Sequence, residues 1–171
     1  MISKPDLTEY LDRIDKQLKQ KITVVAVGGT AMTLHGLKES TKDVDFCVQT
    51  KGDWEAVKSA ARRISSTFRL DLFQGGFIYT LQLPDDYAKK AQPIKAKLRN
   101  LEVRLLSPID IIITKTARLN ERDIEDIRAI VSKKRVNKKK LMQRFRLVKG
   151  SYVASDRDFQ ARFEQVIKEF F

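Results

Sequence analysis

The amino-acid sequence predicts an α/β (α+β) fold, in which a small mixed β-sheet core flanked by helices precedes a C-terminal helical extension. The sheet is indicated by the β-branched run over 22–27 and by further strand-like apolar runs at 44–48 and 101–106. The extension is indicated by a helix-start signal at Ser107, behind which only helix-like segments follow. With 171 residues, 42% of them hydrophobic, the chain can form one domain with its own core.

The elements expected before residue 107 alternate between helices and strands. Leu7, Leu11 and Ile14 recur at helical spacing, which predicts an amphipathic helix. Gly75-Gly76 separates two strand-like runs and predicts a hairpin. The expected elements are a helix over 6–20, a strand over 22–27, a helix over 31–37, a strand over 44–48, a helix over 54–65 with Asp53 as N-cap, strands over 68–73 and 77–83, and a strand over 101–106.

The segment Ser107-Pro108-Ile109-Asp110 predicts the start of a helix. Serine is a favoured N-cap, proline suits the first helical position, and Asp110 can complete a capping box. Three further helices are expected, over 121–133, 137–147 and 156–170. We therefore expect an α/β core over 1–106 and a helical part over 107–171, joined in one compact unit.

The single cysteine and single histidine restrict the chemistry of the chain. One cysteine forms no internal disulfide, which fits a reducing, cytoplasmic location. The first residues lack the apolar core of a signal peptide, and no apolar run approaches the roughly 20 residues of a membrane span. Zinc sites and Cys–His catalysis are disfavoured, so carboxylates, basic side chains, hydroxyls or a carboxylate-held metal must carry any chemistry.

The formal charge of +12 is concentrated near the C-terminus. Ten lysines and arginines and no acid lie between residues 127 and 155, whereas the other 24 basic and 22 acidic residues nearly balance. A basic segment of this kind favours binding to a polyanion such as nucleic acid, although a solvated helix face has the same pattern. The candidate nucleic-acid-binding residues are Lys133, Lys134, Arg135, Lys138, Lys139, Lys140, Arg144 and Arg146.

A glycine pair and two aspartates form the sharpest candidate site. Gly28-Gly29-Thr30 follows the first strand, and Asp43-Val44-Asp45 comes thirteen residues later. Because side chains alternate along a strand, Asp43 and Asp45 point to the same side and repel each other unless a cation lies between them. Mg²⁺ with phosphate oxygens is the natural partner, and a glycine-rich helix start favours phosphate.

A third carboxylate extends this candidate site. Asp71 is the one acid in the strand-like run 68–73. If that strand neighbours the Asp43–Asp45 strand, Asp71 can act as a general base and as a further metal ligand. Each signal is weak by itself, since turns use Gly-Gly and exposed strands carry aspartate, but the three in this order are moderately specific.

These residues resemble the nucleotidyltransferase superfamily of the DNA polymerase β type. The order is strand, Gly-Gly-Thr, helix, Asp-x-Asp on the next strand, then an aspartate within an apolar strand. Within that superfamily the chain is most similar to a minimal prokaryotic branch that includes abortive-infection toxins of the AbiEii type. That closer resemblance rests on Leu106-Ser107-Pro108, Lys115, and the Arg122-Asp123 and Asp126 helix, and the whole resemblance covers residues 22–131.

The resemblance implies an enzyme that transfers a nucleoside monophosphate from an NTP to an acceptor hydroxyl. It implies that Asp43, Asp45 and Asp71 are catalytic and bind Mg²⁺ or Mn²⁺. Nucleotide phosphates would be held by Gly28, Gly29, Thr30 and Lys115. The basic segment suggests an RNA acceptor, with tRNA the one implied by the toxin branch.

Other interpretations of the same residues remain open. The fold could bind nucleic acid without turnover, or its basic helices could dock an acidic antitoxin. Lys115 could extend to solvent instead of reaching a phosphate, and Arg118, Arg122, Asp123 and Asp126 could simply hold their helices together through ion pairs. Trp54 and the phenylalanines are expected in the core rather than at a base-stacking surface.

Overall fold

A computed structural model describes residues 1–148, 150 and 155–171. Lys149, one of the ten basic residues between 127 and 155, lies outside the described residues. The strands are β1 (Ile2–Ser3), β2 (Ile22–Ala26), β3 (Ser40–Thr41), β4 (Val44–Val48), β5 (Leu70–Gln74), β6 (Phe77–Ile78), β7 (Leu81–Gln82), β8 (Gln92–Pro93) and β9 (Leu101–Leu105). The helices are α1 (Lys4–Gln17), α2 (Gly28–Leu34), α3 (Lys51–Arg62), α4 (Tyr87–Lys90), α5 (Pro108–Arg118), α6 (Glu121–Lys133), α7 (Lys138–Val148) and α8 (Asp156–Phe170).

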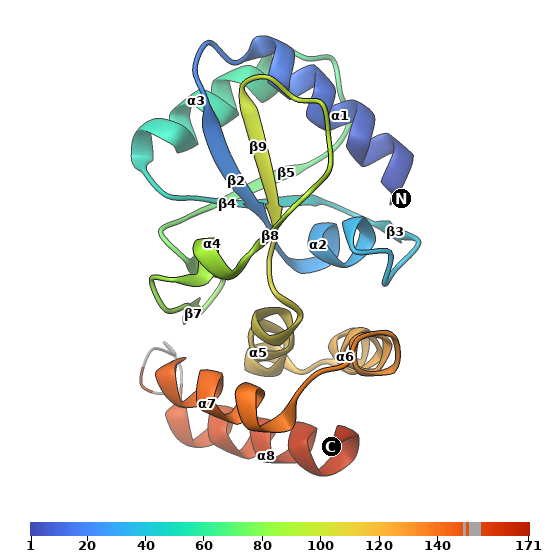
Figure 1. Cartoon of the computed structure of the whole chain (residues 1–171), viewed down its shortest axis with the longest axis vertical. Helices are drawn as coiled ribbons and strands as arrows, with labels where there is room; N and C mark the ends of the chain where they lie inside the picture. Colours follow the sequence, from blue (N-terminus) through green and yellow to red (C-terminus); the bar gives the residue numbers. More distant parts are fainter. Residues whose placement is uncertain (149, 151–154) are drawn as a thin grey trace.

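The main sheet is mixed, as the sequence predicts, with the strand order β7-β6-β5-β4-β2-β9-β8. Its centre combines an antiparallel β2–β4 pair with parallel β2–β9 and β4–β5 pairs. Figure 1 shows α1 and α3 at one end of the molecule and α5 to α8 at the other, with the sheet between them. This arrangement confirms an α/β core followed by a helical extension.

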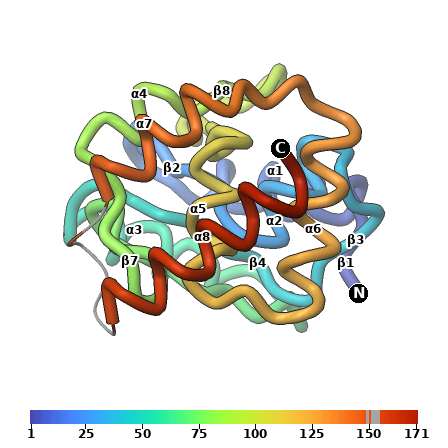
Figure 2. The backbone as a smooth tube through the Cα atoms, turned by 90° about the horizontal axis from the view of Figure 1, so that it is seen from below, coloured from blue at the N-terminus to red at the C-terminus, as the bar shows by residue number. Residues whose placement is uncertain are grey.

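The central strands are buried because their side chains pack against helices on both faces. All five residues of β4 are buried, including Asp45, which is only 5% exposed. The helical extension packs through α5, whose Ile111, Ile112 and Ile113 are fully buried. Figure 2 shows α8 crossing beneath α5, and Phe145 of α7 packs in the interior between these helices.

The helix starts follow the local capping chemistry. Ser107 is the N-cap of α5, as predicted, and accepts the backbone N–H of Asp110. Its hydroxyl donates to the Asp110 carboxylate, a contact that differs from the backbone N–H bond of the expected capping box. The predicted cap at Asp53 is wrong, because Thr50 is the N-cap and Asp53 is its N3 partner. Helix α2 also begins three residues earlier than predicted, at Gly28.

The predicted strand over 77–83 is instead a tight antiparallel hairpin of β6 and β7. The turn between them holds Tyr79 at a φ of +54°, in the left-handed region that non-glycine residues rarely adopt. Because of this turn, Tyr79 leaves the sheet and its ring lies over the end of β4. A β-strand pattern alone gives no sign of such a turn.

Candidate active site

The aspartates of β4 and β5 lie side by side. These strands are parallel, and Asp45 is the register partner of Asp71, while Asp43 directly precedes β4. Register partners project to the same face of a sheet, and the condition on which Asp71 is a candidate, that its strand neighbours the strand of Asp43 and Asp45, is met. Three carboxylate-bearing residues are thus placed at one end of the β4–β5 pair.

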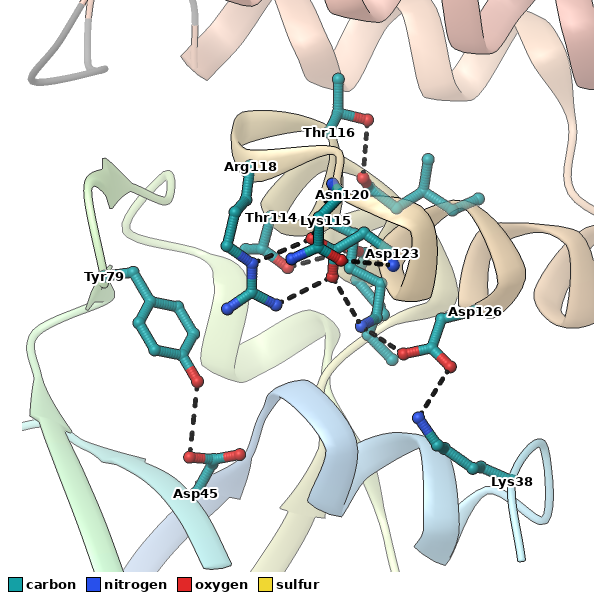
Figure 3. A network of polar contacts seen from close by, with 12 residues as sticks. Lys38, Asp45, Tyr79, Thr114, Lys115, Thr116, Arg118, Asn120, Asp123 and Asp126 are labelled. Atoms are coloured by element: carbon teal, nitrogen blue, oxygen red, sulfur yellow. Dashed lines mark hydrogen bonds and ion pairs between the residues drawn. The ribbon is translucent and has the colours of Figure 1, made fainter. Parts of the chain in front are cut away.

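Burial and like charge together make Asp45 an unusual carboxyl group. Its removal from water and the nearby charges of Asp71 and Asp43 raise the pKa of Asp45 from 3.8 to about 7. The Tyr79 hydroxyl donates to Asp45 Oδ1 across 3.5 Å (Figure 3), which offsets part of this rise. A cation beside Asp45 would relieve the repulsion among the carboxylates.

Thr30 holds the aspartate strand in place. Its hydroxyl accepts the Asp45 backbone N–H at 2.9 Å and lies 3.1 Å from the Asp43 carbonyl oxygen, to which it donates. The Thr41 hydroxyl donates to the same carbonyl at 3.2 Å. Because Thr30 is fully buried and its hydroxyl is engaged on both sides, the expected role of that hydroxyl as a phosphate donor is corrected to a positioning role.

The two glycines allow the aspartates to approach helix α2. Gly28 has a φ of +52°, and a Cβ there would lie 3.0 Å from Asp45 Oδ2. A Cβ on Gly29 would lie only 2.4 Å from Thr41 Oγ1. A larger residue would therefore crowd Asp45 at position 28 and Thr41 at position 29.

Buried ion pairs join α5 to α6 above the carboxylates (Figure 3). Lys115 Nζ lies 2.5 Å from Asp126 Oδ2 and 3.4 Å from Asp123 Oδ1. Arg118 holds Asp123 through two hydrogen bonds, and Lys38 reaches Asp126 at 3.1 Å from the segment after α2. Of the ion pairs expected among Arg118, Arg122, Asp123 and Asp126, the Arg118–Asp123 pair is found. Asp126 pairs instead with Lys115 and Lys38.

An open cleft of about 450 Å³ contains most of these groups. Asp43 and Asp45 form one wall together with Gly29, and Lys115, Arg118 and Arg122 line it from α5 and α6. The charge of Lys115 lowers the pKa of Asp45, opposing the effect of the other carboxylates. The cleft is therefore lined by five acidic residues, three of them on α6, and by five basic ones, so it offers both oxygen ligands for a metal and cations for phosphates.

Sequence reasoning missed Tyr79 and Lys38. Tyr79 lines the cleft and also a neighbouring hollow of about 410 Å³ that Ile78, Thr114 and Arg162 help to form. Its ring makes an edge contact with Phe73 at 4.8 Å between centroids. Only the hairpin turn brings it there, and the sequence contains no motif that marks this placement.

Comparisons with known proteins agree with this geometry. Residues 6–170 match the profile of a family described as "Nucleotidyltransferase of unknown function (DUF6036)". The chain belongs to this family.

The fold is also similar to that of a solved structure. The crystal structure of an antigenic nucleotidyltransferase-like protein from Paracoccidioides brasiliensis aligns with a TM-score of 0.57. The sequence identity is 16%, and the alignment covers 98% of this chain and 90% of that one. None of the curated proteins matches the sequence. The likeness therefore shows the nucleotidyltransferase-like fold and carries no information on substrate.

Most of the candidate nucleic-acid-binding side chains of this nucleotidyltransferase-family chain are exposed. They lie on the end of α6, on α7 and on the link between these helices. Lys134 is half-buried, and the exposed members are Lys133, Arg135, Lys138, Lys139, Lys140 and Arg146. The α6–α7 basic surface is defined by these seven residues. None of the helices in the described ranges is long and apolar enough to span a membrane.

Arg144 does not belong to that surface, so its predicted nucleic-acid role is wrong. It is 5% exposed, and its guanidinium binds Asp110 through Nε at 2.6 Å and Nη2 at 3.1 Å. Asp86, from the segment before α4, accepts a further bond from Nη1 at 2.5 Å. Arg144 instead fastens α7 to α5 and to the sheet part of this family member.

Carboxylate oxygens are the type of ligand that a hard divalent cation prefers, but these carboxylates do not converge on one point. Among the described residues, no three His, Cys, Asp or Glu side chains are arranged to hold a metal ion. Asp71 Oδ1 lies 3.1 Å from Arg69 Nε, so its carboxylate is engaged elsewhere. The oxygen donors nevertheless fit Mg²⁺ or Mn²⁺, as does Asp45, whose pKa is raised by burial and by the charges of Asp71 and Asp43.

Proposed function

We propose that this protein transfers a nucleoside monophosphate from an NTP to an acceptor hydroxyl, with Mg²⁺ or Mn²⁺ as cofactor. The observation that carries the proposal is the pairing of Asp45 with Asp71 on adjacent parallel strands, with Asp43 beside them. Membership in a nucleotidyltransferase family supports this choice over other uses of a carboxylate cluster.

We infer the roles of the side chains in the proposed reaction from their places in the cleft. Asp43 and Asp45 hold the cation, which would neutralise the triphosphate and polarise the reacting phosphate. Lys115 and Arg118 meet the phosphates from α5, and Gly28 and Gly29 let the phosphates approach the start of α2. Asp71 joins the metal site when its carboxylate turns away from Arg69.

The proposed step needs no reactant other than the NTP and the acceptor hydroxyl. The acceptor oxygen forms a bond to the α-phosphorus, and the bond from that phosphorus to the bridging oxygen of the β-phosphate breaks. Pyrophosphate leaves with the electron pair of that bond. Asp71 would take the acceptor hydroxyl proton, because it neighbours Asp45 on the adjacent strand.

The proposed acceptor is RNA, such as a tRNA. The exposed α6–α7 basic surface supports this choice because clustered lysines and arginines favour phosphodiesters. The resemblance to abortive-infection toxins adds an acidic antitoxin as a proposed partner for the same surface. Co-purification with a small acidic protein, reversed by high salt, would test that partner.

Label transfer tests the proposed reaction. Each NTP, labelled in turn at the α- or the γ-phosphate, is incubated with the protein, Mg²⁺ and total RNA. We expect label from the α-phosphate of at least one NTP to enter RNA, no label from the γ-phosphate, and loss of transfer in Asp43→Ala. Absence of α-label transfer with every NTP would contradict the proposal.

A binding role without turnover is the second candidate. The Asp71–Arg69 contact favours it, since that contact keeps the third carboxylate away from the other two. In that case RNA affinity would fall steeply with salt and would be the same in Asp45→Asn. The two candidates therefore differ in whether Asp45→Asn has a measurable effect.

A further inference from the structure

The outer edge of β5 is left open next to the proposed site. Strand β6 pairs with β5 only at Gln74, so β6 does not cover Leu70, Asp71 and Leu72. The Trp54 indole N–H donates to the outward Leu72 carbonyl at 3.3 Å. A hollow of about 440 Å³ follows this edge between α3 and β5.

The groove along this edge has aromatic and cationic walls. Trp54 and Phe68 provide partly buried rings, and Lys58 and Arg62 provide cations from α3. Lys58 Nζ lies 4.1 Å from the centroid of the Trp54 ring. Asp71 is the single acid that lines the groove. We call this the β5-edge groove and define it by these five residues.

We propose that the β5-edge groove binds the reacting end of a single-stranded polynucleotide acceptor. Aromatic side chains interleaved with cations are the general means by which proteins hold single strands, because bases stack on rings while phosphates meet the cations. Apart from Asp71, the lining of the groove offers only cationic and neutral side chains to a phosphodiester. This proposal rests on the proposed function, since it names the acceptor that the transfer would use.

Asp71 gives the groove its connection to the chemistry. The groove reaches Asp71 from the β5 side, whereas the charged cleft reaches Asp45 from the α2 and α5 side. Because Asp45 and Asp71 are register partners, the carboxylate that lines the groove belongs to the direct neighbour of the one that lines the cleft. A terminal hydroxyl in the groove would arrive at Asp71 from the side opposite to the triphosphate.

The α6–α7 basic surface is placed for a different part of the RNA. Figure 1 shows α3 and α7 at opposite ends of the molecule. Lys138, Lys139 and Lys140 are exposed, and they line neither the charged cleft nor the β5-edge groove. The α6–α7 basic surface therefore suits a distant segment of a long acceptor, and the β5-edge groove suits its end.

Trp54 supplies a direct probe because it is the single tryptophan of the chain. A short fluorescein-labelled oligouridylate is titrated and followed by anisotropy, and the unlabelled oligomer is followed by tryptophan fluorescence. We expect saturable quenching of Trp54 at the concentrations that saturate anisotropy. The same titration with oligodeoxythymidylate shows whether the groove distinguishes RNA from DNA.

Charge-reversal variants locate the bound strand. We expect Lys58→Glu/Arg62→Glu to weaken oligouridylate binding by roughly tenfold or more, since two phosphate contacts are lost and the new carboxylates repel the phosphates. Lys95→Glu/Lys97→Glu changes the net charge equally on an exposed loop and is the matched control. We expect it to change affinity by less than about threefold, mainly through long-range charge.

Cross-linking shows which residues lie next to the end of the bound strand. An oligonucleotide that carries 4-thiouridine at its 3′ end is irradiated with the protein, and the linked peptide is identified. A link within residues 54–72 supports the proposal. No oligonucleotide binding, unquenched Trp54 at saturation, or a link confined to α6 and α7 would overturn it. Label transfer to another acceptor would then leave the proposed function standing, whereas binding in the groove without label transfer would contradict the proposed function.

Discussion

Asp45 and Asp71 are register partners on the parallel strands β4 and β5, so one buried carboxyl group has another as its immediate neighbour. This relationship costs stability in the metal-free protein whenever both groups are charged. The pKa of Asp45 is about 7, against an ordinary value of 3.8. The folded state therefore binds the Asp45 proton more tightly than the unfolded state does.

The first prediction follows from this tighter proton binding by the folded state. Stability of the wild-type protein in EDTA should fall as pH rises from about 4 to 7 and then level off, with an upper limit of about 4 kcal/mol from Asp45. Asp45→Asn removes the titrating group, so its stability should exceed that of wild type near pH 8 and lose that advantage near pH 4. Urea unfolding across this range measures both proteins. Parallel pH profiles would contradict the assigned pKa.

The second prediction concerns Gly29, whose missing Cβ leaves room for Thr41 Oγ1. Gly29→Ala should destabilise the protein by about 1–3 kcal/mol, because the new carbon would overlap that oxygen. Adding Thr41→Ala removes the oxygen, so the two changes together should cost less than the sum of their separate effects. Additive losses in thermal unfolding would show that the overlap is relieved elsewhere.

The third prediction separates the hydroxyl of Thr30 from its methyl group. Thr30→Val should cost about 1–3 kcal/mol, because the buried Asp45 N–H loses its acceptor. Thr30→Ser keeps the hydroxyl and should cost about 1 kcal/mol or less, mainly through the lost methyl group. Equal destabilisation of both variants in urea unfolding would argue against the positioning role.

The fourth prediction tests the corrected role of Arg144. Arg144→Gln leaves the fully buried Asp110 without its cation and should cost about 3–5 kcal/mol. Arg146→Gln, two residues along the same helix and exposed, should stay within about 0.5 kcal/mol of wild type. A small effect at Arg144 would mean that Asp110 finds another partner.

Regular periodicity explains why most of the fold could be predicted. Strand β4 and helices α6 and α8 have the bounds that the sequence predicts, because their apolar spacing and caps agree. The start of α2 was missed because Gly28 opens the helix from a left-handed conformation that propensity rules assign to turns. The β6–β7 turn was missed because Tyr79, not glycine, occupies its positive-φ position.

The candidate site also has features that the sequence could predict and features that it could not. The sequence marks Asp71 as a candidate on the condition that its strand neighbours that of Asp43 and Asp45, and the pairing of β4 with β5 meets this condition. Contacts between distant segments could not be predicted, among them Lys38 with Asp126 and Arg144 with Asp86. Charge counting placed Arg144 with its basic neighbours, although burial against Asp110 sets its role.

Crystallography with Mn²⁺ tests the central claim most directly, because Mn²⁺ can replace Mg²⁺ and is visible by anomalous scattering. Crystals would be soaked with Mn²⁺ and a non-hydrolysable NTP analogue. The account predicts an anomalous peak between Asp43 and Asp45, the Asp71 carboxylate turned toward it from Arg69, and phosphate density beside Gly29. A fully bound analogue with no manganese at these carboxylates, or with manganese only elsewhere, would contradict it.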